Sequence, residues 1–181
     1  MINLGVLSDT HIPERARELR PWILPLFRDV GVDAILHAGD ICAPWVLDQL
    51  GQVAPVYAVQ GNRDFALLRH LPLTLEMEFG GIKIGMLHGH GGFESYMADK
   101  LYIMVYGVRE SRYVRRALAT FPQAQVIVFG HTHQALNTWL EGRLIFNPGL
   151  ACGPSKRHPT PTVGLLRIFE GGVEGEIVEK G

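Results

Sequence analysis

The chain has 181 residues, a formal net charge of −1, 47% hydrophobic residues and 19% charged residues. This length predicts a single domain over residues 1–181, and the composition excludes a disordered, collagen-like or coiled-coil chain. The near-neutral charge argues against nucleic acid or a membrane surface as a partner. Two cysteines are too few for a disulfide framework, and neither a signal peptide nor a membrane-spanning run is evident, so we expect a cytoplasmic protein.

The first half of the chain alternates short apolar runs with helical segments. Strands are expected over residues 2–7, 33–37 and 56–60. Helices are expected over residues 21–30 and 44–50, the second closed by Gly51 as a left-handed cap. Continuous apolar strands separated by helices indicate a parallel sheet that is covered on both faces.

The second half of the chain is richer in strands. Residues 73–79 and 82–87 flank Gly80-Gly81 and predict a hairpin. A long helix over 95–120 and a strand over 125–129 follow, and glycine turns then join four more strands in pairs, at 135–140, 143–146, 162–169 and 173–178. This order favours two sheets with helices outside them, packed as helix–sheet–sheet–helix.

Polar side chains that can bind metal ions follow several of these strands. In open α/β sheets, ligands bind at the carboxyl ends of the strands, where the loops converge. The donors are oxygen atoms and imidazoles without a thiolate, which suits Mn, Fe, Zn, Ni or Co better than a structural zinc site. The candidate residues are Asp9, His11, Asp40, Asn62, His88, His90, His131 and His133.

Each motif by itself also has an ordinary structural interpretation. Asp9-Thr10-His11 is commonly a turn, Asp40 can cap the next helix, and Gly61-Asn62 is a frequent turn pair. The most specific element is Gly130-His131-Thr132-His133, because paired histidines after a buried strand are costly unless they are used. All the motifs fall at one edge of the predicted sheets, and together they predict a metal site.

The spacing within two of the motifs predicts where the side chains point. In an extended segment, residues two apart face the same side. We therefore expect Asp9 and His11 to face one crevice while Thr10 faces away. The same argument places His131 and His133 together.

The order of these motifs resembles that of the calcineurin-like metallophosphoesterases. The matching elements are Asp-x-His, Gly-Asp, Gly-Asn, a histidine that ends a strand, and Gly-His-x-His. The short chain and the run Asn147-Pro148-Gly149 are similar to the small YfcE-type phosphodiesterase branch. The resemblance implies an α/β (α+β) fold, a four-layer αββα sandwich of two mixed β-sheets flanked by helices. It also implies two divalent metal ions, Mn²⁺ foremost, with Fe, Zn, Ni, Co or Mg as alternatives.

The resemblance also implies roles for individual residues. One ion would bind Asp9, His11 and His133, and the second would bind Asn62, His88 and His131, with Asp40 bridging the two. The implied reaction is hydrolysis of a small phosphate ester, preferably a phosphodiester, by in-line attack of a metal-bridging hydroxide. Two divalent ions outweigh the charges of two aspartates and a hydroxide, so such a centre would attract a phosphate.

One residue differs from the family pattern, and two further residues are not covered by it. Arg63 stands where many relatives have histidine; it can hold a phosphate oxygen or form a surface ion pair, but it cannot serve as a general acid. His90 is expected to orient the neighbouring ligands or to supply the missing proton. Asp64 is expected to hold Arg63 or a ligand histidine. Asp40, Asn62, Arg63 and His90 thus form the predicted catalytic set.

Some alternatives stay open at this point. The apolar segment 92–107 is either a core helix, a contact in a homo-oligomer or a wall over the active site. Four arginines follow it, at positions 109, 112, 115 and 116, and form either a solvated face or a phosphate-steering surface. A protein-binding scaffold, similar to the retromer subunit with this fold, is the alternative function. The complete set of metal-ligand candidates favours the enzyme, and the absence of a basic surface argues against a nuclease.

Overall fold

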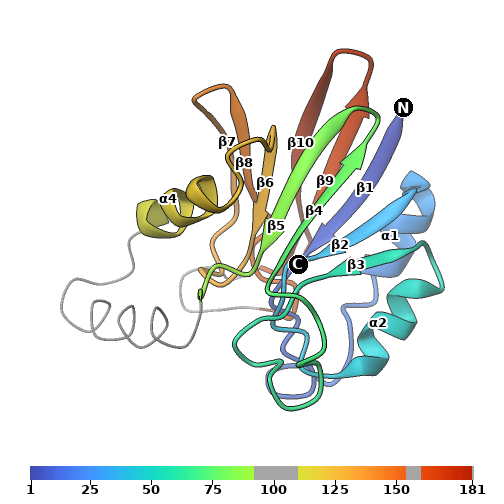
Figure 1. Ribbon diagram of the computed structural model, residues 1–181. Helices are drawn as coiled ribbons and strands as arrows, with labels where there is room; N and C mark the ends of the chain where they lie inside the picture. The colour runs from blue at the N-terminus through green and yellow to red at the C-terminus, as the bar shows by residue number, and fades with distance from the viewer. Residues whose placement is uncertain (92–109, 154–159, 181) are drawn as a thin grey trace.

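The computed structural model describes residues 1–91, 110–153 and 160–180 (Figure 1). Within these ranges the chain forms two five-stranded sheets. The strand order is β10-β9-β1-β2-β3 in the first sheet and β4-β5-β6-β8-β7 in the second. Each sheet combines parallel and antiparallel pairs.

The first sheet has three neighbouring parallel strands, which come from the N-terminal half of the chain and extend to one edge of the sheet. Its strands are β1 (Ile2–Leu7), β2 (Ala34–His37), β3 (Val56–Ala58), β9 (Thr162–Phe169) and β10 (Gly172–Glu179). Helices α1 (Ile23–Val30) and α2 (Pro44–Gly51) connect the parallel strands. Leu7 pairs with His37, and His37 pairs with Ala58, so these three strands end at the same level.

The second sheet also has three parallel strands, and here they lie at its centre between two antiparallel edge strands. Its strands are β4 (Thr74–Phe79), β5 (Ile82–Leu87), β6 (Val126–Phe129), β7 (Leu136–Leu140) and β8 (Arg143–Asn147). Helix α4 (Glu110–Thr120) precedes β6. Leu87 pairs with Phe129, so β5 and β6 also end in register.

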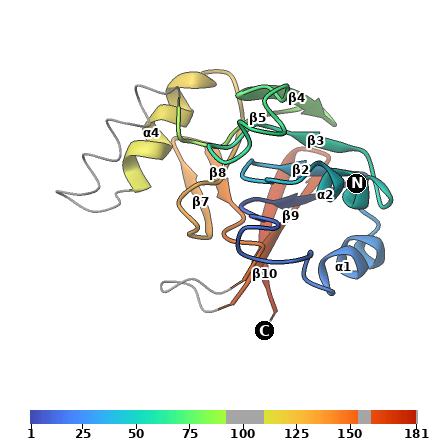
Figure 2. The same cartoon turned by 90° about the horizontal axis from the view of Figure 1, so that it is seen from below.

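The two sheets face each other across a buried apolar layer. Leu36 of the first sheet and Val128 of the second belong to this layer, and both are fully buried. Phe27 of α1 and Leu50 of α2 cover the outer face of the first sheet. Tyr113 and neighbouring residues of α4 cover the second sheet from the opposite side (Figures 1 and 2). The helix–sheet–sheet–helix order predicted from the sequence is therefore confirmed.

Three details differ from the sequence-based expectations or fall outside the described residues. Gly51 is the last residue of α2 and has no left-handed backbone; Gln52, in a right-handed conformation, caps this helix. The left-handed cap is instead Gly31, after α1. Of the helix predicted over 95–120, only residues 110–120 lie in the described part, and the apolar segment 92–107 lies outside it. No helix among the described residues is long and apolar enough to cross a membrane.

The packing of α4 on the second sheet leads to a stability prediction for Gly85. A Cβ atom at this position would overlap the ring of Phe121, which is almost fully buried. Gly85→Ala should lower the free energy of unfolding by about 1–3 kcal/mol. Gly51→Ala is the control, because no atom lies within 4 Å of its added Cβ and the backbone is helical; it should leave stability unchanged or raise it by up to about 1 kcal/mol. Urea denaturation measures both, and equal stability of the two variants would contradict the prediction.

Candidate metal centre

The loops at the carboxyl ends of five strands bring the seven predicted ligands together. Asp9 and His11 follow β1, Asp40 follows β2, and Asn62 follows β3, all in the first sheet. The second sheet contributes His88 after β5 and both His131 and His133 after β6. The site therefore lies across the ends of both sheets, and neither sheet alone contains it.

The first group of donors surrounds one oxygen of Asp9. The Nε2 atoms of His133 and His11 lie 3.2 Å and 3.6 Å from Asp9 Oδ1. These two nitrogens are 3.2 Å apart. One ligand atom from each of these three residues lies within 4.8 Å of the other two, which is compatible with a single metal ion.

The second group of donors surrounds Nε2 of His88. Asn62 Oδ1 lies 3.2 Å from this nitrogen, and Nδ1 of His131 lies 3.3 Å from it. The other ring nitrogen of His88 donates a hydrogen bond of 2.7 Å to the carbonyl oxygen of Ala38. This bond leaves Nε2 directed at the group and fixes which nitrogen can bind an ion.

Asp40 touches both groups with different oxygen atoms. Its Oδ2 lies 3.7 Å from His11 Nε2, and its Oδ1 lies 3.4 Å from His88 Nε2. Asp40 is almost completely buried between them. A carboxylate in this position is suited to bridge two cations.

The backbone around the site differs from the extended segments assumed in the sequence analysis. Five of the predicted ligands have positive φ angles of 46° to 69°, which is the left-handed region: Asp9, His11, Asp40, His131 and His133. The extended-strand argument for their common direction is therefore wrong, although the side chains do converge. Such a conformation costs a non-glycine residue roughly 1–3 kcal/mol and is typical of functional sites. Each left-handed residue turns the chain sharply, so the loops fold over the strand ends.

The two threonines between these ligands point away from the site, as expected. The Thr10 hydroxyl lies 3.2 Å from His37 Nε2 in the protein interior. The Thr132 hydroxyl accepts a hydrogen bond of 3.1 Å from the Asn147 side chain. Both threonines thus anchor their loops while the flanking side chains face the site.

Asp64 supports the loops that carry Asp40 and Asn62. Its side chain is buried and accepts three backbone N–H bonds: Ile41 and Cys42 donate to Oδ1, and Gly61 donates to Oδ2, at 2.7–2.9 Å. Asp64 therefore binds backbone N–H groups of the two loops. The expectation that it holds the side chain of Arg63 or of a ligand histidine is wrong. Because it connects the two loops, it sets the distance between their metal-facing side chains.

Asn147 performs a similar task for the loop after β6. Its amide nitrogen donates to the carbonyl oxygen of Gly130 at 3.0 Å, and its oxygen accepts from the backbone of Gly149 at 2.9 Å. In the sequence, Asn147 was only a mark of family resemblance, and nothing there assigned it this role. This role follows from the pairing of β8 with β6, which the sequence does not show.

The glycine before Asn62 is required by close approach. A Cβ atom on Gly61 would overlap both the backbone nitrogen and Oδ1 of Asp40. The Gly-Asn pair is thus explained by the contact with the preceding Gly-Asp loop, and not by a positive φ angle. The backbone N–H of Arg63 uses the same contact to donate a 2.8 Å bond to Asp40 Oδ1.

Both carboxylates are held in their ionised forms. Burial raises the pKa of Asp9, but interactions with the His11 and His133 rings outweigh this effect and keep the pKa well below its ordinary value. Burial also raises the pKa of Asp40, and the positive charge of His88 overcomes it, so that this pKa is lowered as well. Ionised carboxylates are the form that binds a cation.

The histidines of the site differ in charge. Burial lowers the pKa of His88, but Asp40 and Asp9 raise it to about 9. Burial and the neighbouring His88 lower the pKa of His131 to about 3. In the protein without metal, His88 therefore supplies the positive charge that balances the carboxylates, and His131 is already in the neutral form that binds metal.

The group opens into a cavity of about 300 Å³. It is lined by His11, Arg15, Asp40, Asn62, Arg63, His131 and His133. The Arg63 side chain is half exposed, and its Nε lies 3.5 Å from Glu14 Oε2. The surface ion pair expected for Arg63 thus forms, with Glu14 as the partner. Sequence reasoning missed Arg15, because an arginine in a loop rich in charged residues has no distinguishing pattern.

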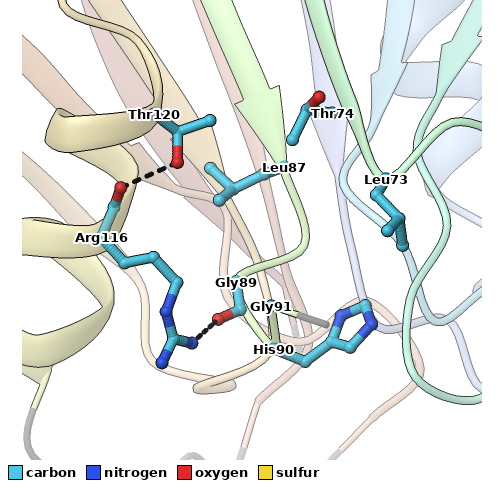
Figure 3. A pocket seen from close by; sticks show the side chains of 8 residues that line it. All are labelled: Leu73, Thr74, Leu87, Gly89, His90, Gly91, Arg116 and Thr120. Carbon is cyan, nitrogen blue, oxygen red and sulfur yellow. Dashed lines mark hydrogen bonds between the residues drawn. The ribbon is translucent and has the colours of Figure 1, made fainter. Parts of the chain in front are cut away.

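His90 is not among the residues that line this cavity. Its ring centroid is 5.4 Å from that of His88 and 6.4 Å from that of His131. It lines a separate, smaller cavity together with Arg116 (Figure 3). Arg116 donates a 2.6 Å bond to the carbonyl oxygen of Gly89, so α4 holds the loop that carries His88 and His90. Burial and, to a smaller extent, the positive charge of His88 lower the pKa of His90 to about 4.

A third set of potential donors, His11, Glu14 and Cys42, also lies within 4.8 Å. A cysteine binds metal as the thiolate. Burial raises the pKa of the Cys42 thiol to about 12, and the nearby Glu14 adds to this effect. The thiol is therefore protonated at neutral pH, and this set is a poorer metal site than the two groups around Asp9 and His88.

Comparison with known proteins agrees with this geometry. The model of the calcineurin-like phosphoesterase superfamily domain matches residues 2–171. A probable metallophosphoesterase of Methanothermobacter thermautotrophicus is 36% identical over 178 residues, covering 98% of this chain and 92% of the relative. Phosphodiesterase MJ0936 of Methanocaldococcus jannaschii is 24% identical over 178 residues, covering 91% of this chain and 92% of that protein. Wild-type Vps29 of Entamoeba histolytica, crystallised with Zn²⁺, superposes with a TM-score of 0.72 at 25% identity and covers 98% of this chain and 99% of that one.

The chain therefore belongs to the calcineurin-like phosphoesterase superfamily, as its motif order indicated. Proteins of this family use divalent metal ions, and the residues present here fit such ions. Asp9 Oδ1 is buried and makes no hydrogen bond to any described residue, yet two imidazole nitrogens surround it. A cation at this point would satisfy the unpaired oxygen.

The buried contacts of Asp64 lead to a stability prediction. Asp64→Asn replaces a carboxylate oxygen with an amide group that donates, opposite backbone N–H groups that also donate. The loss should lower the free energy of unfolding by about 1–3 kcal/mol. Urea denaturation of the metal-free protein measures it, with the exposed Asp29→Asn as the matched control. Equal stability of the two variants would show that these backbone bonds contribute nothing.

Proposed function

We propose that this protein is a dinuclear metal-dependent phosphoesterase that hydrolyses small phosphodiesters. The observation that carries the proposal is the position of Asp40, whose two oxygens face two separate groups of donors. A site built for one ion has no need of a buried carboxylate between two such groups. The relationship to a phosphodiesterase over most of the chain supports the choice of substrate class.

The ligands divide between the two groups as their distances suggest. One ion would bind Asp9, His11 and His133, and Asp40 would be shared with the second. The remaining ligands of the second ion would be Asn62, His88 and His131, which are neutral donors once His88 has lost its proton. Mn²⁺ is the ion of first choice, because oxygen and imidazole donors without thiolate suit it.

Divalent ions held there would activate water and neutralise charge on the phosphate. The side chains of the protein orient the substrate around them. Arg63 lines the cavity beside Asn62, where its guanidinium can hold a phosphate oxygen in a bidentate manner. His90 lies beside the His88 ring and lines a different cavity, so we assign it as a positioning residue and not as the general acid.

The alternative function is a protein-binding scaffold with this fold. The structural likeness to Vps29 is compatible with such a role but does not favour it over hydrolysis. A scaffold does not need two ionised, buried carboxylates or left-handed backbone at five candidate ligands. The activity measurement below separates the two functions.

The first test is turnover of bis(p-nitrophenyl) phosphate by the manganese-loaded protein. Asn62→Ala and His131→Ala each remove one donor of the second group, so kcat should fall at least roughly 100-fold. His70→Ala is the control, because this exposed histidine is outside the cavity and should keep full activity. Full activity in the two site variants would refute the assigned site, and an inert wild-type protein would favour the scaffold.

The second test counts the ions by calorimetric titration of Mn²⁺ into metal-free protein. Wild-type protein should bind two ions, and each bound Mn²⁺ should stabilise the fold by about 2.7 kcal/mol at a free concentration 100 times its Kd. Asp40→Asn removes charge from both groups and should weaken both binding events. The exposed Asp48→Asn should bind like wild type. A single ion in the wild type, or unchanged binding in Asp40→Asn, would contradict a bridged pair.

A further inference from the structure

Two arginines from different loops line the cavity above the proposed metal centre. Arg15 comes from the loop after β1, and Arg63 comes from the loop after β3. Both share this space with His11 and Asn62, one candidate ligand from each group. A phosphate held at the centre would therefore lie within the same cavity as two guanidinium groups.

The position of Arg15 is tied to the site by its backbone. Its N–H donates a hydrogen bond of 2.8 Å to the carbonyl oxygen of His11, so a tight turn follows the ligand histidine directly. Only three residues separate Arg15 from His11 along the chain, and one of them is the buried Ile12. The turn therefore keeps the start of the Arg15 side chain in a fixed relation to the metal-facing imidazole.

The two arginines differ in what neutralises them. Arg63 lies 3.5 Å from the Glu14 carboxylate and forms an ion pair with it at the half-exposed rim of the cavity. The Arg15 guanidinium makes neither an ion pair nor a hydrogen bond with any residue that the structure describes, and its side chain is exposed at the cavity. Unlike Arg63, Arg15 thus has an uncompensated charge among the described residues, and its N–H donors are available to a ligand.

We propose that Arg15 is a specificity-determining residue that binds a second negative charge on the substrate. This inference rests on the proposed function. A simple diester has one negative charge at phosphorus, which the proposed ions would already match. A second charge, either on a monoester dianion or on a phosphate adjacent to the scissile one, needs a further cation. The substrate class is therefore one with two negative charges at or beside the reacting phosphorus. In a dinucleoside diphosphate the bond cleaved is the anhydride between two phosphates that are each esterified once, which is close to the diester preference proposed above. A monoester dianion would replace that preference.

The kinetic test compares three substrates at about pH 8, where a monoester has two negative charges. They are p-nitrophenyl phosphate, diadenosine diphosphate and the singly charged bis(p-nitrophenyl) phosphate. Arg15→Ala should lower kcat/KM for a doubly charged substrate roughly tenfold, mainly through KM, and leave the singly charged diester within about twofold. Whichever of the first two substrates shows the loss identifies the source of the second charge.

Two control variants make the result specific. Arg15→Lys keeps the charge and should recover most of the loss. Arg17→Ala removes an exposed arginine from the same loop but outside the cavity, and should behave like wild type on all three substrates. An equal loss on all three substrates, or no loss on any, in Arg15→Ala would overturn the role of Arg15.

A binding measurement gives a readout that does not depend on turnover. Calorimetry with the manganese-loaded protein should show that Arg15→Ala weakens inorganic phosphate roughly tenfold at about pH 8 and leaves dimethyl phosphate unchanged. Equal effects on both ligands would overturn the inference. A wild-type protein that hydrolyses no phosphate ester would instead refute the proposed function, so the two failures are distinguishable.

Discussion

Asp9 and Asp40 place two carboxylates in the protein interior, where the imidazole ring of His11 contacts both. Two buried negative charges would repel each other and would normally become protonated. Here the neighbouring histidines hold both in the ionised form, and backbone N–H groups of His131 and Arg63 donate to them at 3.0 Å and 2.8 Å. The other candidate donors lie around this pair, and the loops after the strands position them there.

Holding that pair requires an unusual backbone and a rigid frame. The left-handed conformation of the candidate ligands costs free energy, which buried hydrogen bonds from Asp64 and Asn147 offset. The frame is the matched ends of the parallel strands in both sheets, which keeps the five loops at one level. α4 adds a further restraint, because Arg116 binds the loop that carries His88 and His90. The site is therefore a property of the whole αββα sandwich.

The same fold serves proteins with different names, among them metallophosphoesterases and Vps29. The fold alone does not determine what such a protein does, and the side chains at the strand ends carry the distinction. In this chain those side chains include seven candidate metal donors, and two arginines line the cavity beside them. Arg63 is partly neutralised by Glu14, whereas Arg15 faces the cavity with its charge intact.

The sequence by itself determined the layer order, the places of all ten described strands and the seven candidate ligands. Continuous apolar runs define buried strands, and polar donors directly after such runs must fall at one edge of a sheet. It could not determine that left-handed residues, and not an extended segment, aim Asp9 and His11 at the site, because φ angles of this kind follow from long-range contacts. The roles of Asp64, Asn147 and Arg15 were likewise decided only in three dimensions. Each depends on loops that are distant in sequence and meet only when both sheets have formed.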